Sequence, residues 1–148
     1  MSIYQLINKE NLSDWEEKMM LLSNNCLDSQ TQVWHINSIK RVASCIYIKS
    51  RNDFIVAQNI GISNVTGSLC AERSAITAAV AKYPDLKFEE ITDIFIIGEN
   101  NPLLPCGVCC EWLYKINPSM NLYTLKQDKV LKIKISDYYG DENTIESR

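Results

Sequence analysis

Cys70-Ala71-Glu72-Arg73 is the stretch around which this 148-residue sequence is organised, and Pro105-Cys106-Gly107-Val108-Cys109 completes it. Zinc in proteins is coordinated tetrahedrally by sulfur and nitrogen, and a catalytic zinc site keeps one of its four positions open for water. The thiolates of the three cysteines can fill the other positions. Glu72 stands two residues after the first cysteine, where a general acid/base for that water is needed. The pattern predicts a hydrolytic site with Zn²⁺ held by Cys70, Cys106 and Cys109.

Both stretches are expected to open a helix. Alanine-rich sequence follows Cys70 as far as about Lys82, and Pro84 ends it. A second helix is predicted from Cys106 to about Ile116. The first turn of a helix carries unpaired N–H groups and the positive end of the helix dipole, which stabilise thiolates and carboxylates. Two helix N-termini are therefore predicted to converge on one metal ion.

Arg73 is the candidate for a charged neighbour of the metal site. Three thiolates around one Zn²⁺ leave an excess of negative charge, which a nearby cation would reduce so that the bound water can still be acidified. Arg73 follows Glu72 directly and could supply that cation. A plain surface salt bridge is the alternative role for this side chain.

Length and composition restrict the remaining possibilities. A chain of 148 residues predicts one domain over residues 1–148, with a frayed polar tail at 141–148. We find no secretory signal and no apolar run long enough for a membrane span, so the six cysteines favour cytoplasmic metal binding over disulfides. The net charge of −3 argues against a nucleic-acid partner and favours a small-molecule substrate.

The other predicted elements surround these two helices. A first helix is predicted over Asn11–Asp28, because Ser13 and Glu16 form a capping box and an apolar stripe recurs at helical spacing. The stripe consists of Trp15, Met19, Leu22 and Cys26. Five strands are predicted, at Arg41–Lys49, Phe54 to about Ile60, Ile91–Gly98, Leu122–Lys126 and Val130–Ile135. This order predicts a three-layer α/β domain, a mixed sheet with helices on its faces.

With these motifs the chain resembles the small zinc-dependent cytidine deaminases, the group that includes free-nucleoside cytidine deaminases and blasticidin-S deaminase. The likeness covers roughly Val42 to Gly140 and is strongest in the two motif stretches. The resemblance implies a five-stranded sheet covered by helices and a homo-oligomer, usually a tetramer and otherwise a dimer. It also implies that Glu72 shuttles protons and that the backbone of Ala71 holds the exocyclic amine of the base. Tyr139 matches an aromatic residue that reaches across a subunit boundary to cover the base.

Some positions depart from the nucleoside deaminases that the chain resembles. Those enzymes carry an Asn-x-Glu pair that holds the sugar, and here Asn59 is present whereas the position of the glutamate is Gly61. Thr66-Gly67 and Val42-Ala43-Ser44 look more like the blasticidin-S deaminase branch. Cys110 stands where arginine commonly follows the second zinc cysteine, and we expect it to be buried.

These residues predict hydrolytic deamination of a cytosine-like ring, with Glu72 passing the proton of the attacking water to ring N3 and then to the leaving ammonia. Cytidine or deoxycytidine is the first candidate substrate. A cytosine nucleoside analogue such as blasticidin S is the second, and a nucleotide or polynucleotide is the third, because the sequence lacks a basic, aromatic-rich stretch.

Two other classes of protein stay open at this point. A structural zinc site would need a fourth protein ligand from His35, Cys45 or Cys110. Cys110 adjoins Cys109, so its side chain is expected to point away from the shared helix face, and the other two residues have no motif spacing. The only histidine has no neighbouring motif that indicates a catalytic role. A nucleoside-binding protein without turnover would fit Gly61, but the presence of Glu72 counts against it.

Overall fold

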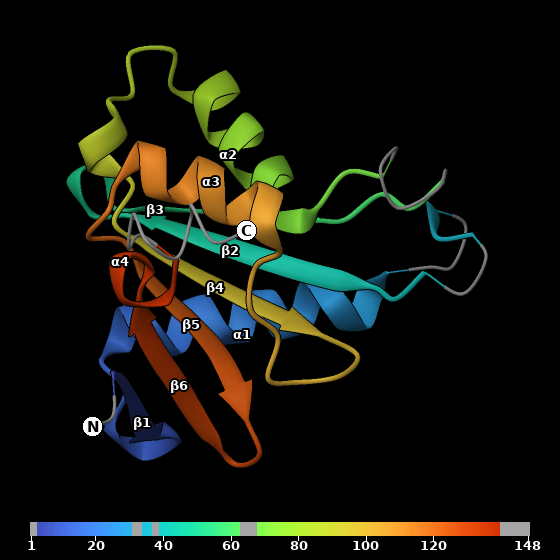
Figure 1. The fold of residues 1–148 in the computed structure, drawn as a ribbon, viewed down its shortest axis with the longest axis vertical. Helices are drawn as coiled ribbons and strands as arrows, with labels where there is room; N and C mark the ends of the chain where they lie inside the picture. The colour runs from blue at the N-terminus through green and yellow to red at the C-terminus, as the bar shows by residue number, and fades with distance from the viewer. Residues whose placement is uncertain (1–2, 31–33, 37–38, 63–67, 140–148) are drawn as a thin grey trace.

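A computed structural model describes residues 3–30, 34–36, 39–62 and 68–139 of the chain (Figure 1). The predicted frayed tail at 141–148, Gly140 and the Thr66-Gly67 segment lie outside the described residues.

The sheet has six strands in the order β1-β6-β5-β4-β2-β3, and only β4 and β5 run parallel to each other. The strands are β1 (Tyr4–Asn8), β2 (Val42–Ile48), β3 (Asp53–Gln58), β4 (Asp93–Gly98), β5 (Asn121–Lys126) and β6 (Lys129–Lys134). The predicted mixed sheet is therefore confirmed, but the expected count of five strands is wrong. The additional strand, β1, is a largely exposed edge strand that pairs with β6, and such a strand has little apolar alternation for a sequence pattern to reveal.

Helices cover both faces of the sheet, which confirms the predicted three-layer α/β fold (Figure 1). Helix α1 (Asp14–Ser29) lies on one face, and α2 (Ala71–Lys82) and α3 (Gly107–Ile116) lie on the other. Successive side chains of β2 alternate between the two apolar cores, as the period of a strand requires: Cys45 and Tyr47 face α1, whereas Ile46 and Ile48 face α2. The chain also forms the short helix α4 (Ile135–Tyr138) and 3-10 turns at Lys9–Asn11, Lys49–Arg51 and Phe88–Glu90.

Helix α1 begins later than predicted but uses the predicted capping box. The 3-10 turn Lys9–Asn11 precedes it, and the backbone N–H of Ser13 donates to Glu16 Oε1 at 3.0 Å. Tyr123 at the centre of the sheet donates its hydroxyl to Glu16 Oε2 at 2.8 Å. The predicted apolar stripe packs on the sheet, with Met19 fully buried.

We expect Glu16→Gln to destabilise the protein at neutral pH but not at acid pH. Burial by itself would raise the pKa of Glu16, but the hydrogen bonds from Ser13 and Tyr123 outweigh it and the pKa is lowered. A carboxyl whose pKa is lowered by folding contributes stability above its unfolded pKa of about 4.3, and that contribution is lost as the pH falls through the folded value. The melting temperature of the wild type should therefore exceed that of the variant at pH 7, and the gap should close below about pH 4.

Glu17→Gln is the matched control, because Glu17 is the next residue of α1 and is exposed. A gap for Glu16→Gln that persists unchanged at acid pH would contradict this account of the Glu16 carboxylate.

Within the described residues, no helix combines the length and the apolar character that crossing a membrane requires.

Candidate functional site

The topology of the sheet brings two helix N-termini to the same edge. Strand β2 lies between β3 and β4 and runs antiparallel to both, so β3 and β4 end at one edge. The chain continues from those two ends into α2 and α3. Cys70 is the N-cap of α2 and Cys106 is the N-cap of α3, with Cys109 in the first turn of α3. The predicted convergence of two helix N-termini is confirmed, and two of the cysteines cap the helices rather than lying inside them.

The sulfur atoms of the three cysteines form a cluster that fits a tetrahedral metal ion. All three Sγ atoms lie within 4.8 Å of one another, and the Sγ atoms of Cys70 and Cys106 are 3.9 Å apart. Tetrahedral zinc with Zn–S bonds of about 2.3 Å separates its sulfur ligands by about 3.8 Å. In the described part of the chain this is the only group of three or more His, Cys, Asp or Glu residues with such an arrangement. The three thiol groups and their spacing therefore fit zinc.

No fourth protein ligand joins the cluster from the candidates named in the sequence. Cys110 is 2% exposed and its thiol donates to the carbonyl of Pro105 at 3.4 Å, so the expectation that it is buried is confirmed. Cys45 lies in the core on the α1 face of the sheet, opposite α2 and α3. His35 lies against Asn59, as described below. The three-ligand arrangement keeps one coordination position open, as a catalytic zinc site requires.

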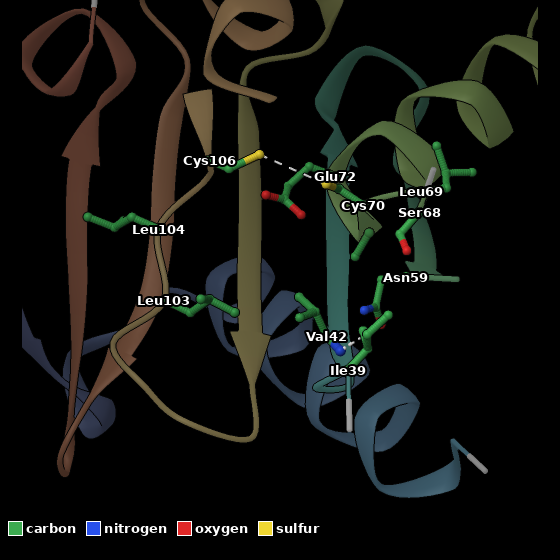
Figure 2. A pocket seen from close by; sticks show the side chains of 11 residues that line it. Ile39, Val42, Asn59, Ser68, Leu69, Cys70, Glu72, Leu103, Leu104 and Cys106 are labelled. Carbon is green, nitrogen blue, oxygen red and sulfur yellow. Dashed lines mark hydrogen bonds between the residues drawn. The ribbon is translucent and has the colours of Figure 1, made fainter. Parts of the chain in front are cut away.

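Glu72 lies beside the cysteines at one end of a pocket (Figure 2). Its side chain is only 5% exposed. Burial raises the pKa of Glu72 to about 7, and the neighbouring Cys70 thiolate adds to the rise. A carboxyl group with a pKa close to the operating pH can both accept and return a proton, which is what a general acid/base must do.

Arg73 supplies a positive charge next to the first cysteine. Its Nη2 atom lies 3.4 Å from Cys70 Sγ, and its guanidinium group lies 5.8 Å from the centre of the Trp112 ring. Hydrogen bonds from the Cys109 thiol and from Arg73 lower the pKa of Cys70 to about 5. Among the described residues Arg73 forms no ion pair with a carboxylate. Arg73 thus lies beside the first predicted ligand, and its role as the charged neighbour of a bound zinc ion stays a prediction.

The pocket opens beside these groups and has a volume of about 240 Å³. It lies between three segments: the end of the loop that leads into α2, the residues around the start of β2 and the end of β3, and the loop that leads into α3 (Figure 2). The described residues that line it are Ile39, Val42, Asn59, Ser68, Leu69, Cys70, Ala71, Glu72, Leu103, Leu104 and Cys106. Ala71 and Asn59, two of the predicted substrate contacts, are thus placed at the pocket.

The polar atoms of Asn59 are engaged within the protein. Its Oδ1 atom accepts the backbone N–H of Val42 at 2.8 Å, and its Nδ2 atom donates to the carbonyl of Lys40 at 2.8 Å. His35 Nε2 lies 2.9 Å from both the backbone oxygen and Oδ1 of Asn59, and since both partners are acceptors, this nitrogen carries the proton. His35 is therefore placed as a support for Asn59, and the sugar-binding role of Asn59 stays a prediction.

Tyr139 does not come to the pocket. It is 9% exposed, belongs to the core between the sheet and α2 and α3, and packs edge-on against Tyr114 at 6.2 Å between ring centres. The contact across a subunit boundary that the resemblance implies for this residue stays a prediction.

Sequence reasoning did not identify the aliphatic part of the pocket wall. Leu103 and Leu104 come directly before Pro105 in the second motif stretch, so their nearness to a predicted ligand was a usable signal. Ile39 had no such signal, because only the fold brings it to the site.

Comparisons with known proteins agree with this geometry. The sequence model of the cytidine and deoxycytidylate deaminase zinc-binding region matches residues 13–124, well over half of the chain. No curated protein matches the sequence.

Several solved structures share the fold. The cytidine deaminase of Burkholderia pseudomallei superposes with a TM-score of 0.72 at 18% identity, covering 88% of this chain and 98% of that protein. The cytidine deaminase of Mycobacterium leprae superposes with a TM-score of 0.66 at 19% identity, covering 88% of this chain and 100% of that protein. The cytidine deaminase of Bacillus anthracis superposes with a TM-score of 0.66 at 17% identity, covering 90% of this chain and 93% of that protein.

The match of the family model over residues 13–124 and the cysteine cluster that fits zinc lead to one conclusion. The chain belongs to the family that carries the cytidine and deoxycytidylate deaminase zinc-binding region, and it is a zinc-dependent hydrolytic deaminase.

Proposed function

We propose that this enzyme replaces the 4-amino group of a cytosine nucleoside, with cytidine and deoxycytidine as the reference substrates, by an oxygen from water and releases ammonia. The observation that supports this most strongly is the buried Glu72 carboxyl beside the cluster of Cys70, Cys106 and Cys109 at the end of the pocket. In this proposal the three cysteines hold the zinc and Glu72 is the catalytic residue.

In the proposed reaction, each protein group around the cytosine ring has one role. Bound zinc supplies the Lewis acid that makes a water acidic near neutral pH. Glu72 accepts a proton from that water and delivers one to ring N3, which makes the carbon that bears the amine more electrophilic. The water oxygen bonds to that carbon, and Glu72 takes the remaining proton from the new hydroxyl and passes it to the amine. The C–N bond then breaks, ammonia leaves, and the ring keeps the oxygen as a carbonyl. The backbone of Ala71 holds the amine, and Arg73 offsets the negative charge of the thiolates.

The first experiment is an ultraviolet deamination assay with zinc-loaded protein. It offers cytidine, deoxycytidine, cytosine, cytidine monophosphate and blasticidin S at matched concentrations. Turnover of a nucleoside with release of ammonia is the expected result, and the monophosphate should be a poor substrate, because the described lining of the pocket contains no lysine or arginine. If protein that carries one zinc ion per chain deaminates none of the five compounds, the proposed function is contradicted.

We further propose that the enzyme works in the cytoplasm as a homo-oligomer, either a tetramer or a dimer. Exposed apolar side chains beside the two helix N-termini support an association between copies of the chain: Leu69, Val108 and Trp112 are all well exposed. Light scattering on the zinc-loaded protein measures the assembly, and a monomer at micromolar concentration would contradict it.

A further inference from the structure

Most of the described side chains that line the pocket apart from Glu72 and the cysteines are hydrocarbon. They come from three separate segments and are Ile39, Val42, Leu69, Leu103 and Leu104. In Figure 2, Ile39 and Val42 lie at the end of the pocket away from Glu72 and Cys106. The remaining polar side chains among the described lining residues are Ser68 and Asn59. Glu72 is the only carboxylate among them, so the described wall offers no second acidic group to a ligand.

Asn59 offers no further acceptor to a bound molecule. A carboxamide oxygen has two lone pairs, and Oδ1 of Asn59 already accepts from the backbone of Val42 and from His35. The amide nitrogen has two N–H groups, and one of them donates to the carbonyl of Lys40. A ligand hydroxyl that lies against Asn59 would therefore find a donor there but no acceptor for its own proton.

Ile39 takes the space where a side chain at position 61 would project. A Cβ atom built on Gly61 would stand 2.6 Å from Ile39 Cγ2, which is far inside van der Waals contact. The backbone of Gly61 cannot shift easily, because its N–H donates to the carbonyl of Trp34 and its carbonyl accepts the N–H of Ile36, both at 2.7 Å. Position 61 therefore has no room for a side chain beside Ile39, and Ile39 itself presents a hydrocarbon surface to the pocket.

A hydroxyl group buried against hydrocarbon without a partner loses its hydrogen bonds to water and gains none in return. We propose that this pocket selects a cytosine ring whose N1 substituent is poor in hydroxyl groups, and that Ile39 determines this selection. The inference rests on the proposed function and narrows its substrate class. Under it, each hydroxyl that is removed from the sugar improves the substrate.

The test measures kcat/KM of the zinc-loaded enzyme for cytidine, 2′-deoxycytidine, 2′,3′-dideoxycytidine and the free base cytosine. We expect kcat/KM to rise in the order cytidine, deoxycytidine, dideoxycytidine, with roughly 10- to 100-fold between the first and the last. Cytosine should fall below dideoxycytidine, because it lacks the apolar ring that contacts the aliphatic wall. Cytidine equal to or better than dideoxycytidine would overturn the inference.

A matched pair of variants tests the role of Ile39. Thr and Val have nearly the same shape, and both keep a methyl group at the Cγ2 position over Gly61. Ile39→Thr adds a hydroxyl partner to the wall and should reduce the preference for dideoxycytidine over cytidine by about 3- to 10-fold, whereas Ile39→Val should leave the preference within about 2-fold. If the two variants change the preference for dideoxycytidine over cytidine equally, or if Ile39→Thr does not change it, Ile39 does not determine the selection.

A binding series separates this inference from the proposed function. Zinc-loaded Glu72→Gln protein is titrated by calorimetry with the same four compounds, so that affinity is read without turnover. If the affinities rise in the order cytidine, deoxycytidine, dideoxycytidine but the wild type shows no turnover, the proposed function is contradicted. The inference that the aliphatic side chains of the pocket select the ligand then still holds. Turnover with the reverse order, or no binding of any compound, would overturn the inference.

Discussion

Glu72→Gln is expected to lower kcat by about 10²- to 10⁴-fold while leaving the fold and the bound zinc in place. The side chain is buried at the end of the pocket beside the cysteine cluster, where the proposed mechanism requires a proton acceptor. Glutamine has nearly the same shape but can neither accept nor return the proton. Because burial disfavours the charged carboxylate, a neutral amide at this position should not destabilise the protein.

The assay for Glu72→Gln combines three measurements on one preparation: initial rates of deamination, zinc per chain and the melting temperature. Glu111→Gln is the matched control, since Glu111 lies on α3, the helix that carries Cys109, but is exposed and pairs with Lys115 at the surface. Full activity of Glu72→Gln would remove Glu72 from the mechanism. Loss of zinc in the same variant would show that the residue acts on the metal site and not on the proton.

The second large effect is expected from the adjacent cysteines of α3. Cys109→Ala should abolish tight zinc binding and activity together, whereas Cys110→Ala should keep both. The Sγ atom of Cys109 belongs to the cluster with Cys70 and Cys106, but that of Cys110 turns to the carbonyl of Pro105. Loss of a group that only supports a ligand costs about 10- to 100-fold in metal affinity, so loss of a ligand should cost more than about 100-fold.

Competition with a chromogenic chelator measures the zinc affinity of the two variants. Both cysteines are buried, so both variants remove a thiol of the same size from the same helix, and only the metal should distinguish them. The melting temperature should rise with zinc for the wild type and for Cys110→Ala but not for Cys109→Ala, since only a ligand that binds the folded state stabilises it. Retention of zinc by Cys109→Ala, or its loss from Cys110→Ala, would contradict the proposed ligand set.

The sequence alone was sufficient for the parts of this protein that depend on residues close together in the chain. The ligand motifs predict helix N-termini because the caps and the first turn need only local spacing, and α2 and α3 begin there. The capping box of α1 and the two neighbouring strands β2 and β3 are equally local, and the sequence predicts them. The buried run of β4 and the alternation of helix and strand were enough for the three-layer class.

The tertiary structure decided the features that depend on contacts between distant segments. Strand β1 exists because β6 offers it a partner, and its own exposed side chains carry no pattern that predicts it. The polar atoms of Asn59 are occupied because the chain folds His35, Lys40 and Val42 against it. Ile39 reaches the pocket because the backbone of Gly61 pairs with the preceding segment. Local residue spacing was thus enough to identify the zinc ligands and the general acid/base at one end of the pocket. The shape and polarity of the rest of the pocket lining arise from long-range packing, which residue spacing does not encode.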